Sequence, residues 1–400
     1  MKEKELGKDV FSMLSWFRAQ KVKDAKVLVA GAGALGNEAL KNLALFGVGN
    51  IVVVDFDTIE HSNLTRSILF RAEDADKKLY KADVASERIK EINPEIKTLP
   101  VCGNLITDVG LGLYRRMDVI IGCLDNLQAR ILLNRLCFRA GKTWVDGGIG
   151  DLEGQVSVYQ PGCNCYECNL TEDEKQDLNK RISCAGVVKM NEIAGRVATT
   201  PVSASIIAAV QVQEAMKIIH QEDVNSGNFS SLVGKMFVYE GMHPSVDIFD
   251  FSSFNPECNA HELWEPVVEV LELSADTPVC IAIEIIKNRL AVDSVEINLR
   301  NNKFVDKIVS RSGNKCFFPM LPESDIHEYI DTNDEIRDIQ AYEGFYQNDF
   351  ENLDSSFPYR NLTLKQTGIP YFDIIQVSTE KGIYYVELSM DKKYYAEIIG

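Results

Sequence analysis

The sequence has no excess of positive charge, few histidines and no long apolar run. Its 42 lysines and arginines stand against 59 aspartates and glutamates, which gives a formal net charge of −17 at pH 7. We therefore exclude nucleic acid as the main partner, because no basic excess exists to displace counterions. No stretch approaches about 18 consecutive apolar residues, so we expect no membrane span. The five histidines are not placed for a Ser-His-Asp triad, and hydrolase chemistry finds no support.

Two common signals are also missing. The opening segment MKEKELGKDV is too charged for a secretory signal peptide, so we expect a cytoplasmic protein. In that setting the ten cysteines are better explained by metal binding or catalysis than by disulfides. No Walker sequence G-x-x-x-x-G-K occurs, which excludes a P-loop kinase or ATPase.

Strand and helix signals alternate through the first half of the chain. We predict buried strands over 26–30, 51–54 and 119–122, and helices over 37–46, 81–92 and about 126–140. This alternation predicts an α/β fold with a doubly wound, mostly parallel, Rossmann-like sheet. A long helix is expected over about 202–220.

The pattern changes after a proline-containing junction at 255–265. Half-exposed strands are predicted over 294–299 and 384–388, which indicates a separate C-terminal α+β domain. We therefore divide the chain into domains 1–268 and 269–400, with a polar and charged stretch over 169–183 inside the first.

A glycine-rich turn lies between the first predicted strand and helix. Gly31, Gly33 and Gly36 form G-x-G-x-x-G, which lets backbone N–H groups approach a phosphate at a helix N-terminus. Asp55 follows the next strand, where a carboxylate can bind ribose hydroxyls. Taken alone, this fingerprint favours NAD or FAD over ATP.

The segment after Asp55 favours ATP instead. Arg66 and Lys81 supply cations for the charge that grows on the α-phosphate as pyrophosphate leaves. Asp125 follows a short apolar strand and could hold Mg²⁺. The alternatives are that Arg66 and Lys81 are surface charges and that Asp125 caps the following helix.

Two further groups of residues involve cysteine. Cys165 and Cys168 form a C-x-x-C pair, which is half of a tetrahedral zinc site. Cys184 follows Lys180 and Arg181, whose charges favour a thiolate. A thiolate near an acyl-adenylate could accept the acyl group as a thioester. The alternatives are reduced structural cysteines and a plain buried thiol at Cys184.

Seven short motifs together resemble the ubiquitin-activating superfamily, which includes the adenylyltransferases of sulfur-carrier pathways. The matching segments are 27–36 (VLVAGAGALG), 40–45 (LKNLAL), 55–59 (DFDTI), 62–66 (SNLTR), 123–126 (CLDN), 165–168 (CYEC) and 214–217 (EAMK). The resemblance covers roughly residues 20–265. It implies that ATP and Mg²⁺ bind here, with Asp55 and Asp57 on the nucleotide side, Asn63, Arg66 and Lys81 at phosphates, and Asp125 at Mg²⁺.

The resemblance also assigns the cysteines. The second half of the zinc site would come from Cys258 and His261, giving a structural Zn²⁺ with four protein ligands and no open position. The segment over about 169–200 would be the catalytic-cysteine loop, and its Cys184 would form a thioester with the activated protein.

The expected function is ATP-dependent adenylation of the C-terminal carboxylate of a ubiquitin-like protein, followed by thioester formation and transfer to a conjugating enzyme. The resemblance implies a homodimer or heterodimer, a C-terminal domain that could be ubiquitin-like and recruit the conjugating enzyme, and relatives in bacterial ubiquitin-like defence systems. Alternatives are a sulfur-carrier-protein adenylyltransferase, a pseudoenzyme subunit of a heterodimer, and an NAD oxidoreductase.

One feature of the family is not matched. Many members carry an arginine pair in an N-terminal helix that reaches an ATP phosphate, often from the partner subunit. Here the only N-terminal arginine is Arg18, close to the first predicted strand. Whether Arg18, Lys8 or a partner supplies this contact is open.

Overall fold

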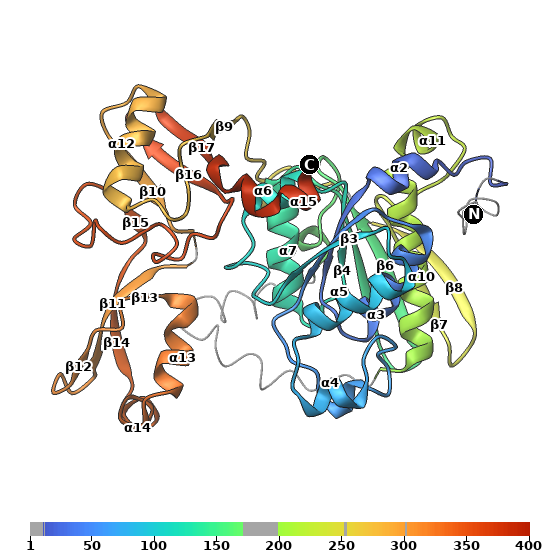
Figure 1. Ribbon diagram of the computed structural model, residues 1–400, viewed down its shortest axis with the longest axis horizontal. Coiled ribbons are helices and arrows are strands. Elements are labelled where there is room, and N and C mark those ends of the chain that lie inside the picture. Colours follow the sequence, from blue (N-terminus) through green and yellow to red (C-terminus); the bar gives the residue numbers. More distant parts are fainter. Residues whose placement is uncertain (1–10, 12, 171–198, 252–253, 301) are drawn as a thin grey trace, which may run out of the picture. The chain divides into compact units, whose positions relative to one another are not determined.

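The computed structural model describes residue 11 and residues 13–170, 199–251, 254–300 and 302–400. They form two compact units (Figure 1). The nucleotide-motif unit contains the chain up to residue 105, residues 114–263 and the last four residues. The C-terminal unit contains residues 106–113 and 264–396.

An eight-stranded sheet forms the centre of the nucleotide-motif unit. Its order is β3-β2-β1-β4-β5-β6-β7-β8, and the pairs from β3 to β5 are parallel while those from β5 to β8 are antiparallel. This confirms the mostly parallel, Rossmann-like sheet. The strands are β1 (Lys26–Ala30), β2 (Asn50–Val54), β3 (Lys97–Val101), β4 (Val119–Gly122), β5 (Trp144–Ile149), β6 (Glu153–Tyr159), β7 (Lys235–Glu240) and β8 (Ser245–Asp250).

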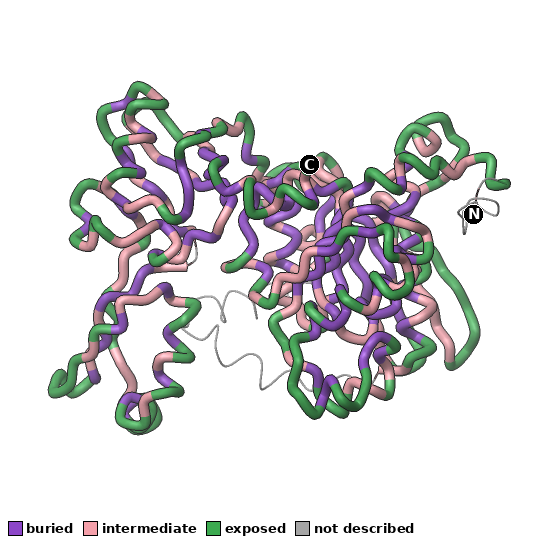
Figure 2. Tube along the Cα trace, in the orientation of Figure 1, coloured by how far each residue is buried: buried purple, intermediate pink, exposed green. Residues whose placement is uncertain are grey.

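Helices cover both faces of this sheet, which agrees with the burial of four consecutive residues of β1, Val27 to Ala30. Val27 and Val29 belong to the core that the sheet shares with α3, α5 and α10, whereas Leu28 is buried outside that core. Helix α7 packs against β4 and β5. Buried residues accordingly concentrate in the central strands, whereas β8 is exposed along its length (Figure 2). The helices are α2 (Ala19–Asp24), α3 (Ala34–Phe46), α4 (Ala72–Asp76), α5 (Lys81–Ile92), α6 (Leu111–Arg116), α7 (Leu127–Arg139), α10 (Pro201–Ile219) and α11 (Gln221–Asn225).

Helix α10 is the longest of the described helices and is apolar enough to cross a membrane by length and composition. Half of its apolar window is buried inside the structure. Ile207, Ala208 and Val212 lie in the core, and the helix packs against α3 and β5. Its apolar surface is therefore explained by core packing. The Thr200 side chain accepts a hydrogen bond from Ser203 N and Pro201 begins the helix, which is a favourable N-terminus.

The C-terminal unit contains two sheets in which most strand pairs are antiparallel. The larger has the order β15-β10-β16-β17-β9, with β9 parallel to β17, and packs its core on helix α12. The smaller surrounds β11, which pairs with β12, β13 and β14. The elements are β9 (Val267–Val270), α12 (Val279–Leu290), β10 (Glu296–Asn298), β11 (Phe304–Ser310), β12 (Cys316–Phe317), β13 (Leu321–Pro322), α13 (Ile326–Asp331), α14 (Asp334–Tyr342), β14 (Phe345–Phe350), β15 (Asn352–Leu353), β16 (Ile374–Thr379) and β17 (Gly382–Leu388). The last helix, α15 (Ala396–Ile399), belongs to the nucleotide-motif unit from its second residue onward.

Residues 106–113 belong to this C-terminal unit although they lie between β3 and β4 in the chain. Leu111 N donates to Asp373 Oδ1 at 2.8 Å, and Gly112 N donates to Phe372 O at 3.0 Å. A Cβ atom on Gly112 would lie 2.4 Å from Phe372 O, so the close approach requires glycine. The C-terminal unit therefore includes a segment that the sequence places inside the nucleotide-motif domain.

Candidate functional site

The glycine turn joins β1 to α3. Gly31 has φ +96°, which favours glycine, and a Cβ atom on it would lie 2.5 Å from Cys123 O. A Cβ atom on Gly36 would lie 2.0 Å from Gly31 O, so the turn can close on the helix only with glycine there. Gly33 is the N-cap of α3 and faces open space. The turn therefore leaves backbone N–H groups available at a helix N-terminus, which suits an anion.

Asp55 lies directly after β2, beside this turn. Its Oδ2 accepts a hydrogen bond from Ala32 N at 2.7 Å, and its Oδ1 accepts one from Asp57 N at 2.8 Å. Burial raises the pKa of Asp55, while the Lys81 charge and the two N–H donors act in the opposite direction. The carboxylate is thus fixed at the carboxyl edge of the sheet, where ligands of parallel α/β proteins bind.

Lys81 opens α5 and is held by Asp57. Lys81 Nζ lies 2.6 Å from Asp57 Oδ2, and Lys81 N donates to Asp57 O at 2.9 Å. The side chain of Lys81 is 11% exposed and that of Asp57 is 51% exposed. Lys81 is therefore not a free surface charge, and the Asp57 carboxylate is occupied by the lysine.

The segment after Asp57 is tied to the glycine turn through Asn37 on α3. Asn37 Nδ2 donates to Ala32 O at 2.7 Å, and its Oδ1 accepts from Leu69 N at 2.8 Å. In the same segment Asn63 Oδ1 accepts from Glu60 N at 2.9 Å, and Arg66 Nη1 donates to Ser62 O at 3.0 Å. Sequence reasoning missed Asn37, although it directly follows the last glycine of the motif.

Asp125 lies three residues beyond β4 and is exposed. The alternative that it caps the next helix is wrong. Asn126 is the N-cap of α7, and its side chain accepts from Ala129 N at 2.8 Å. Asn126 Nδ2 in turn donates to Asp125 Oδ1 at 3.2 Å. Asp125 therefore keeps a carboxylate oxygen at the carboxyl edge of the sheet without a capping role.

Arg130 on α7 supports the Asp125 turn and was not foreseen. Its Nη2 donates to Leu124 O at 2.8 Å and to Gly147 O at 3.0 Å. Its Nε lies 3.5 Å from the buried Asp146 carboxylate. The sequence signal that could have identified Arg130 is its position five residues after Asp125, on the helix that follows.

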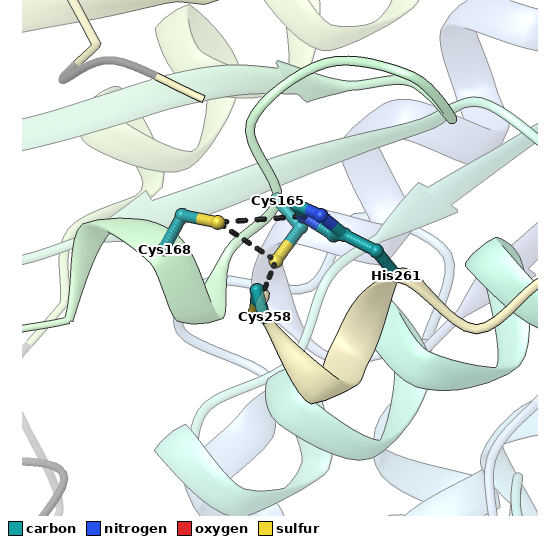
Figure 3. Close-up of side chains that lie close together, drawn as sticks. All are labelled: Cys165, Cys168, Cys258 and His261. Atoms are coloured by element: carbon teal, nitrogen blue, oxygen red, sulfur yellow. Dashed lines mark hydrogen bonds between the residues drawn. The ribbon is translucent and has the colours of Figure 1, made fainter. Parts of the chain in front are cut away.

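Four potential metal ligands come together from two parts of the chain (Figure 3). Cys165 Sγ lies 3.6 Å from Cys168 Sγ and 3.8 Å from Cys258 Sγ, while Cys168 Sγ lies 3.3 Å from His261 Nε2. All four ligand atoms lie within 4.8 Å of one another. Tetrahedral Zn²⁺ with Zn–S bonds of about 2.3 Å requires sulfur atoms about 3.8 Å apart, so the donor set and spacing fit zinc.

The environment of the ligands sets their protonation. Burial raises the pKa of the Cys165 and Cys258 thiols and lowers the pKa of His261. A neutral imidazole can donate its lone pair directly, whereas the thiols must lose protons when a metal binds. The distances between the sulfur atoms are far longer than a disulfide bond of about 2.05 Å, so Cys165, Cys168 and Cys258 are free thiols.

Three further residues were named from the sequence as candidates for the site. Cys184 and Lys8 are outside the described residues. Arg18 precedes α2 at the amino edge of the sheet, where Val22 O accepts from Gly49 N and Ala25 O accepts from Asn50 N. Its guanidinium donates to Ser15 O at 2.9 Å and lies 3.7 Å from Asp223. The glycine turn is at the other end of β1, roughly 17 Å away along the strand.

Comparison with known proteins completes the description of the site. The model of the ThiF family matches residues 9–260. The molybdopterin-synthase adenylyltransferase of Escherichia coli is 33% identical over 224 residues, covering 55% of this chain and 81% of that protein. The SAMP-activating enzyme E1 of Haloferax volcanii is 29% identical over 234 residues, covering 58% and 79%. The SUMO-activating enzyme subunit 2 of Dictyostelium discoideum is 36% identical over 158 residues, covering 39% of this chain and only 24% of that protein. The chain thus spans about a quarter of the length of its SUMO-activating relatives.

Proposed function

Because this chain belongs to the ThiF family, we propose that it is an ATP-dependent enzyme that adenylates the C-terminal carboxylate of a ubiquitin-like protein. The observation that carries the proposal is the meeting of the glycine turn, Asp55 and Asp125 at one edge of the sheet. Strand β1 pairs with both β2 and β4, so the segments that follow these three strands are neighbours. Relatives named for molybdopterin synthase and for SAMP activation support the same chemistry.

The proposed first step is nucleotidyl transfer. A carboxylate oxygen of the modifier attacks the α-phosphorus of ATP, and the bond to the bridging oxygen of the β-phosphate breaks. Pyrophosphate leaves with that electron pair, and the modifier becomes an acyl-adenylate. No group of the protein is consumed, so the residues act by positioning and by electrostatic stabilisation.

The residues divide this task according to their positions. The α3 N-terminus would receive phosphate and Asp55 would accept hydrogen bonds from ribose. Lys81, Arg66 and Asn63 would contact phosphate oxygens. Asp125 would hold Mg²⁺, which neutralises phosphate charge when bound. Arg130 would keep the Asp125 turn in place through Leu124 O.

The second step we propose is thioester formation on Cys184. The thiolate would attack the carbonyl carbon of the adenylate and AMP would leave, after which the acyl group would pass to a conjugating enzyme. The C-terminal unit would recruit that enzyme. The metal site of Cys165, Cys168, Cys258 and His261 would hold a structural Zn²⁺, since four protein ligands leave no open position.

We also propose that the enzyme acts as a dimer. Arg18 lies at the edge of the sheet opposite the glycine turn of its own chain and is paired with Asp223. An N-terminal cation that contacts ATP would then come from another residue or from a partner subunit, either a second copy or a related chain.

A second candidate is adenylation of a sulfur-carrier protein. The likeness to the E. coli molybdopterin-synthase adenylyltransferase favours it, because that likeness covers 81% of the relative. The first chemical step is the same for both candidates. They differ in whether a conjugating enzyme accepts the acyl group afterwards.

The first test is modifier-dependent ATP–pyrophosphate exchange with Asp125→Ala. We expect a loss of roughly 100-fold, because phosphate charge would be left without its Mg²⁺ carboxylate. Asp247→Ala is the matched control, since Asp247 is an exposed aspartate on β8. Exchange by Asp125→Ala within a few-fold of the unaltered chain would remove Asp125 from the site.

The second step is tested separately with Cys184→Ala. Pyrophosphate exchange should persist while the adduct with the modifier that is sensitive to reducing agent is lost. If the adduct still forms, another cysteine is the nucleophile. If the unaltered chain exchanges pyrophosphate but never forms the adduct, the sulfur-carrier candidate replaces the thioester proposal.

A further inference from the structure

Helix α7 contacts both halves of the Cys165, Cys168, Cys258 and His261 cluster, although the halves are separated by about 90 residues of chain. The contacts come from one stripe of its last two turns, because residues four apart lie on the same face of a helix. We call the ion pairs of this stripe the arginine clamps, namely Arg135 with Glu167 and Arg139 with Glu262.

The first clamp holds the Cys165–Cys168 turn. Glu167 lies between these two cysteines in the sequence, and its carboxylate accepts two hydrogen bonds from Arg135. Arg135 Nε lies 2.9 Å from Glu167 Oε1, and Arg135 Nη2 lies 2.7 Å from Glu167 Oε2. This bidentate geometry fixes orientation as well as distance. The side chain of Glu167 is only 14% exposed, so solvent screens the pair weakly.

The second clamp holds the Cys258–His261 turn. Glu262 directly follows the ligand His261, and Arg139 Nε donates to Glu262 Oε2 at 3.0 Å. Arg139 lies one helical turn beyond Arg135. One rigid helix therefore anchors a residue adjacent to a ligand in each half.

The helix also orients the imidazole itself. Phe138 on α7 stacks on His261 with ring centroids 5.2 Å apart and an interplanar angle of 15°. Phe254 stacks on His261 as well, at 4.8 Å and 2°. Figure 3 shows the imidazole of His261 directed toward Cys168 Sγ, which lies 3.3 Å from Nε2. Stacking on Phe138 holds the ring in this orientation.

Resting on the metal site proposed above, we infer that Arg135 and Arg139 are positioning residues that preorganise the four ligands for the metal. Their side chains hydrogen-bond to Glu167 and Glu262, so the positioning effect passes through these two carboxylates. Preorganisation raises affinity because the protein then spends less free energy on ordering the ligands when the metal binds. Partners in this outer shell affect metal affinity by about 10–100-fold in other proteins.

The experiment measures Zn²⁺ affinity of the full chain by competition with a chromogenic chelator, and uses Co²⁺ as a spectroscopic probe of tetrahedral thiolate ligation. We expect Arg135→Gln and Arg139→Gln each to weaken Zn²⁺ binding about tenfold, and Glu167→Gln to act like Arg135→Gln. The double variant of Arg135 and Glu167 should be no worse than either single one, because the two residues act as a unit. Arg135→Lys keeps the charge without the bidentate fork and should recover only part of the affinity.

Arg88→Gln is the matched control. Arg88 lies on α5, donates to Glu91 at 2.7 Å and has a side chain 22% exposed, close to the 24% of Arg139. Its loss should leave Zn²⁺ affinity unchanged. If the clamp variants bind Zn²⁺ within twofold of the unaltered chain, the inference is overturned, even where they lower the melting temperature of the metal-free protein. If the unaltered chain binds no Zn²⁺, the proposed metal site itself fails, which is a separate outcome.

Discussion

Asp55 and Asp57 are two residues apart but have different partners. Asp55 accepts backbone N–H groups from the glycine turn and from Asp57, whereas the Asp57 carboxylate pairs with Lys81 Nζ at 2.6 Å. The family resemblance implies that both aspartates lie on the nucleotide side. In the structure the Asp57 carboxylate links the end of β2 to the start of α5, and this ion pair sets where the Lys81 ammonium group lies.

Asp57→Asn should therefore act through Lys81. The amide keeps the size of the side chain but removes the charge that holds the ammonium group, so Lys81 samples other rotamers. We expect KM for ATP in pyrophosphate exchange to rise roughly tenfold with a smaller change in kcat. Asp57→Glu should recover part of the loss. A kcat decrease equal to that of Lys81→Ala, with KM unchanged, would contradict a positioning role.

The pKa of Asp55 gives a prediction about pH. Burial raises this pKa above that of an ordinary aspartate, about 3.9. The Asp55 carboxylate therefore becomes protonated at a higher pH than an ordinary aspartate as the solution is acidified. If it binds ribose as proposed, adenosine affinity, which involves no phosphate titration, should fall as the pH is lowered through this raised pKa while circular dichroism shows an intact fold. Constant adenosine affinity down to pH 4 would show that Asp55 does not bind the ribose in its ionised form.

At the scale of elements, α7 joins two sites that sequence reasoning treated separately. Near its start, the Asn126 side chain donates a hydrogen bond to Asp125, and Arg130 donates to Leu124 O and Gly147 O. Phe138 and Arg139 at its end contact the His261 turn. A 13-residue helix spans about 20 Å, so one rigid element connects the Asp125 turn to the metal ligands.

Loss of the proposed Zn²⁺ should lower stability more than intrinsic chemistry, because a site with four protein ligands leaves no open position for a reaction. Elemental analysis of the purified chain should find one zinc. His261→Ala should reduce zinc content and lower the melting temperature by roughly 5 °C or more, because metal binding contributes directly to folding free energy. Pyrophosphate exchange well below the melting temperature should change less. Unaltered zinc content in the variant would exclude His261 as a ligand.

At the scale of the whole molecule, the two units are interleaved in sequence. Residues 106–113 leave the nucleotide-motif unit after β3, donate backbone hydrogen bonds to Phe372 and Asp373, and return before β4. Leu111 and Leu113 in this segment are buried. Part of the connection between β3 and β4 therefore belongs to the C-terminal unit, so this unit is not formed only by the residues that follow the Rossmann-like sheet in the chain.

Removal of residues 269–400 should consequently destabilise what is left. The crossover would lose its hydrogen-bond partners at Phe372 and Asp373 and its packing against Phe372. We expect a melting temperature lower by several degrees and reduced pyrophosphate exchange, measured beside the full chain. Gly112→Val in the full chain is the companion variant, because its side chain would meet Phe372 O and should produce a similar, smaller loss. A truncated chain with full stability and exchange would show that the crossover folds without the C-terminal unit.

Much of the nucleotide-motif unit could be predicted because its signals are local. Apolar runs bounded by turn residues identify β1, β2 and β4, and α5 and β4 have the predicted bounds. The glycine turn followed by Asp55 is also a local pattern, since strand, turn and helix are consecutive. Strand β3 was missed because Pro100 within it argues against a strand, and it is tolerated here at the edge of the sheet.

The sequence by itself therefore determined the alternation of strands and helices, the glycine turn between β1 and α3, and the residue types proposed to bind nucleotide and metal. Only the tertiary structure decided which of them meet. It paired Asp57 with Lys81, gave the capping of α7 to Asn126 in place of Asp125, and assigned residues 106–113 to the C-terminal unit. It also placed Arg135 and Arg139 beside both halves of the metal cluster. Most of these outcomes depend on contacts between residues far apart in the chain. The capping of α7 depends on a choice between neighbouring side chains with similar propensities. A local sequence pattern predicts neither kind of outcome.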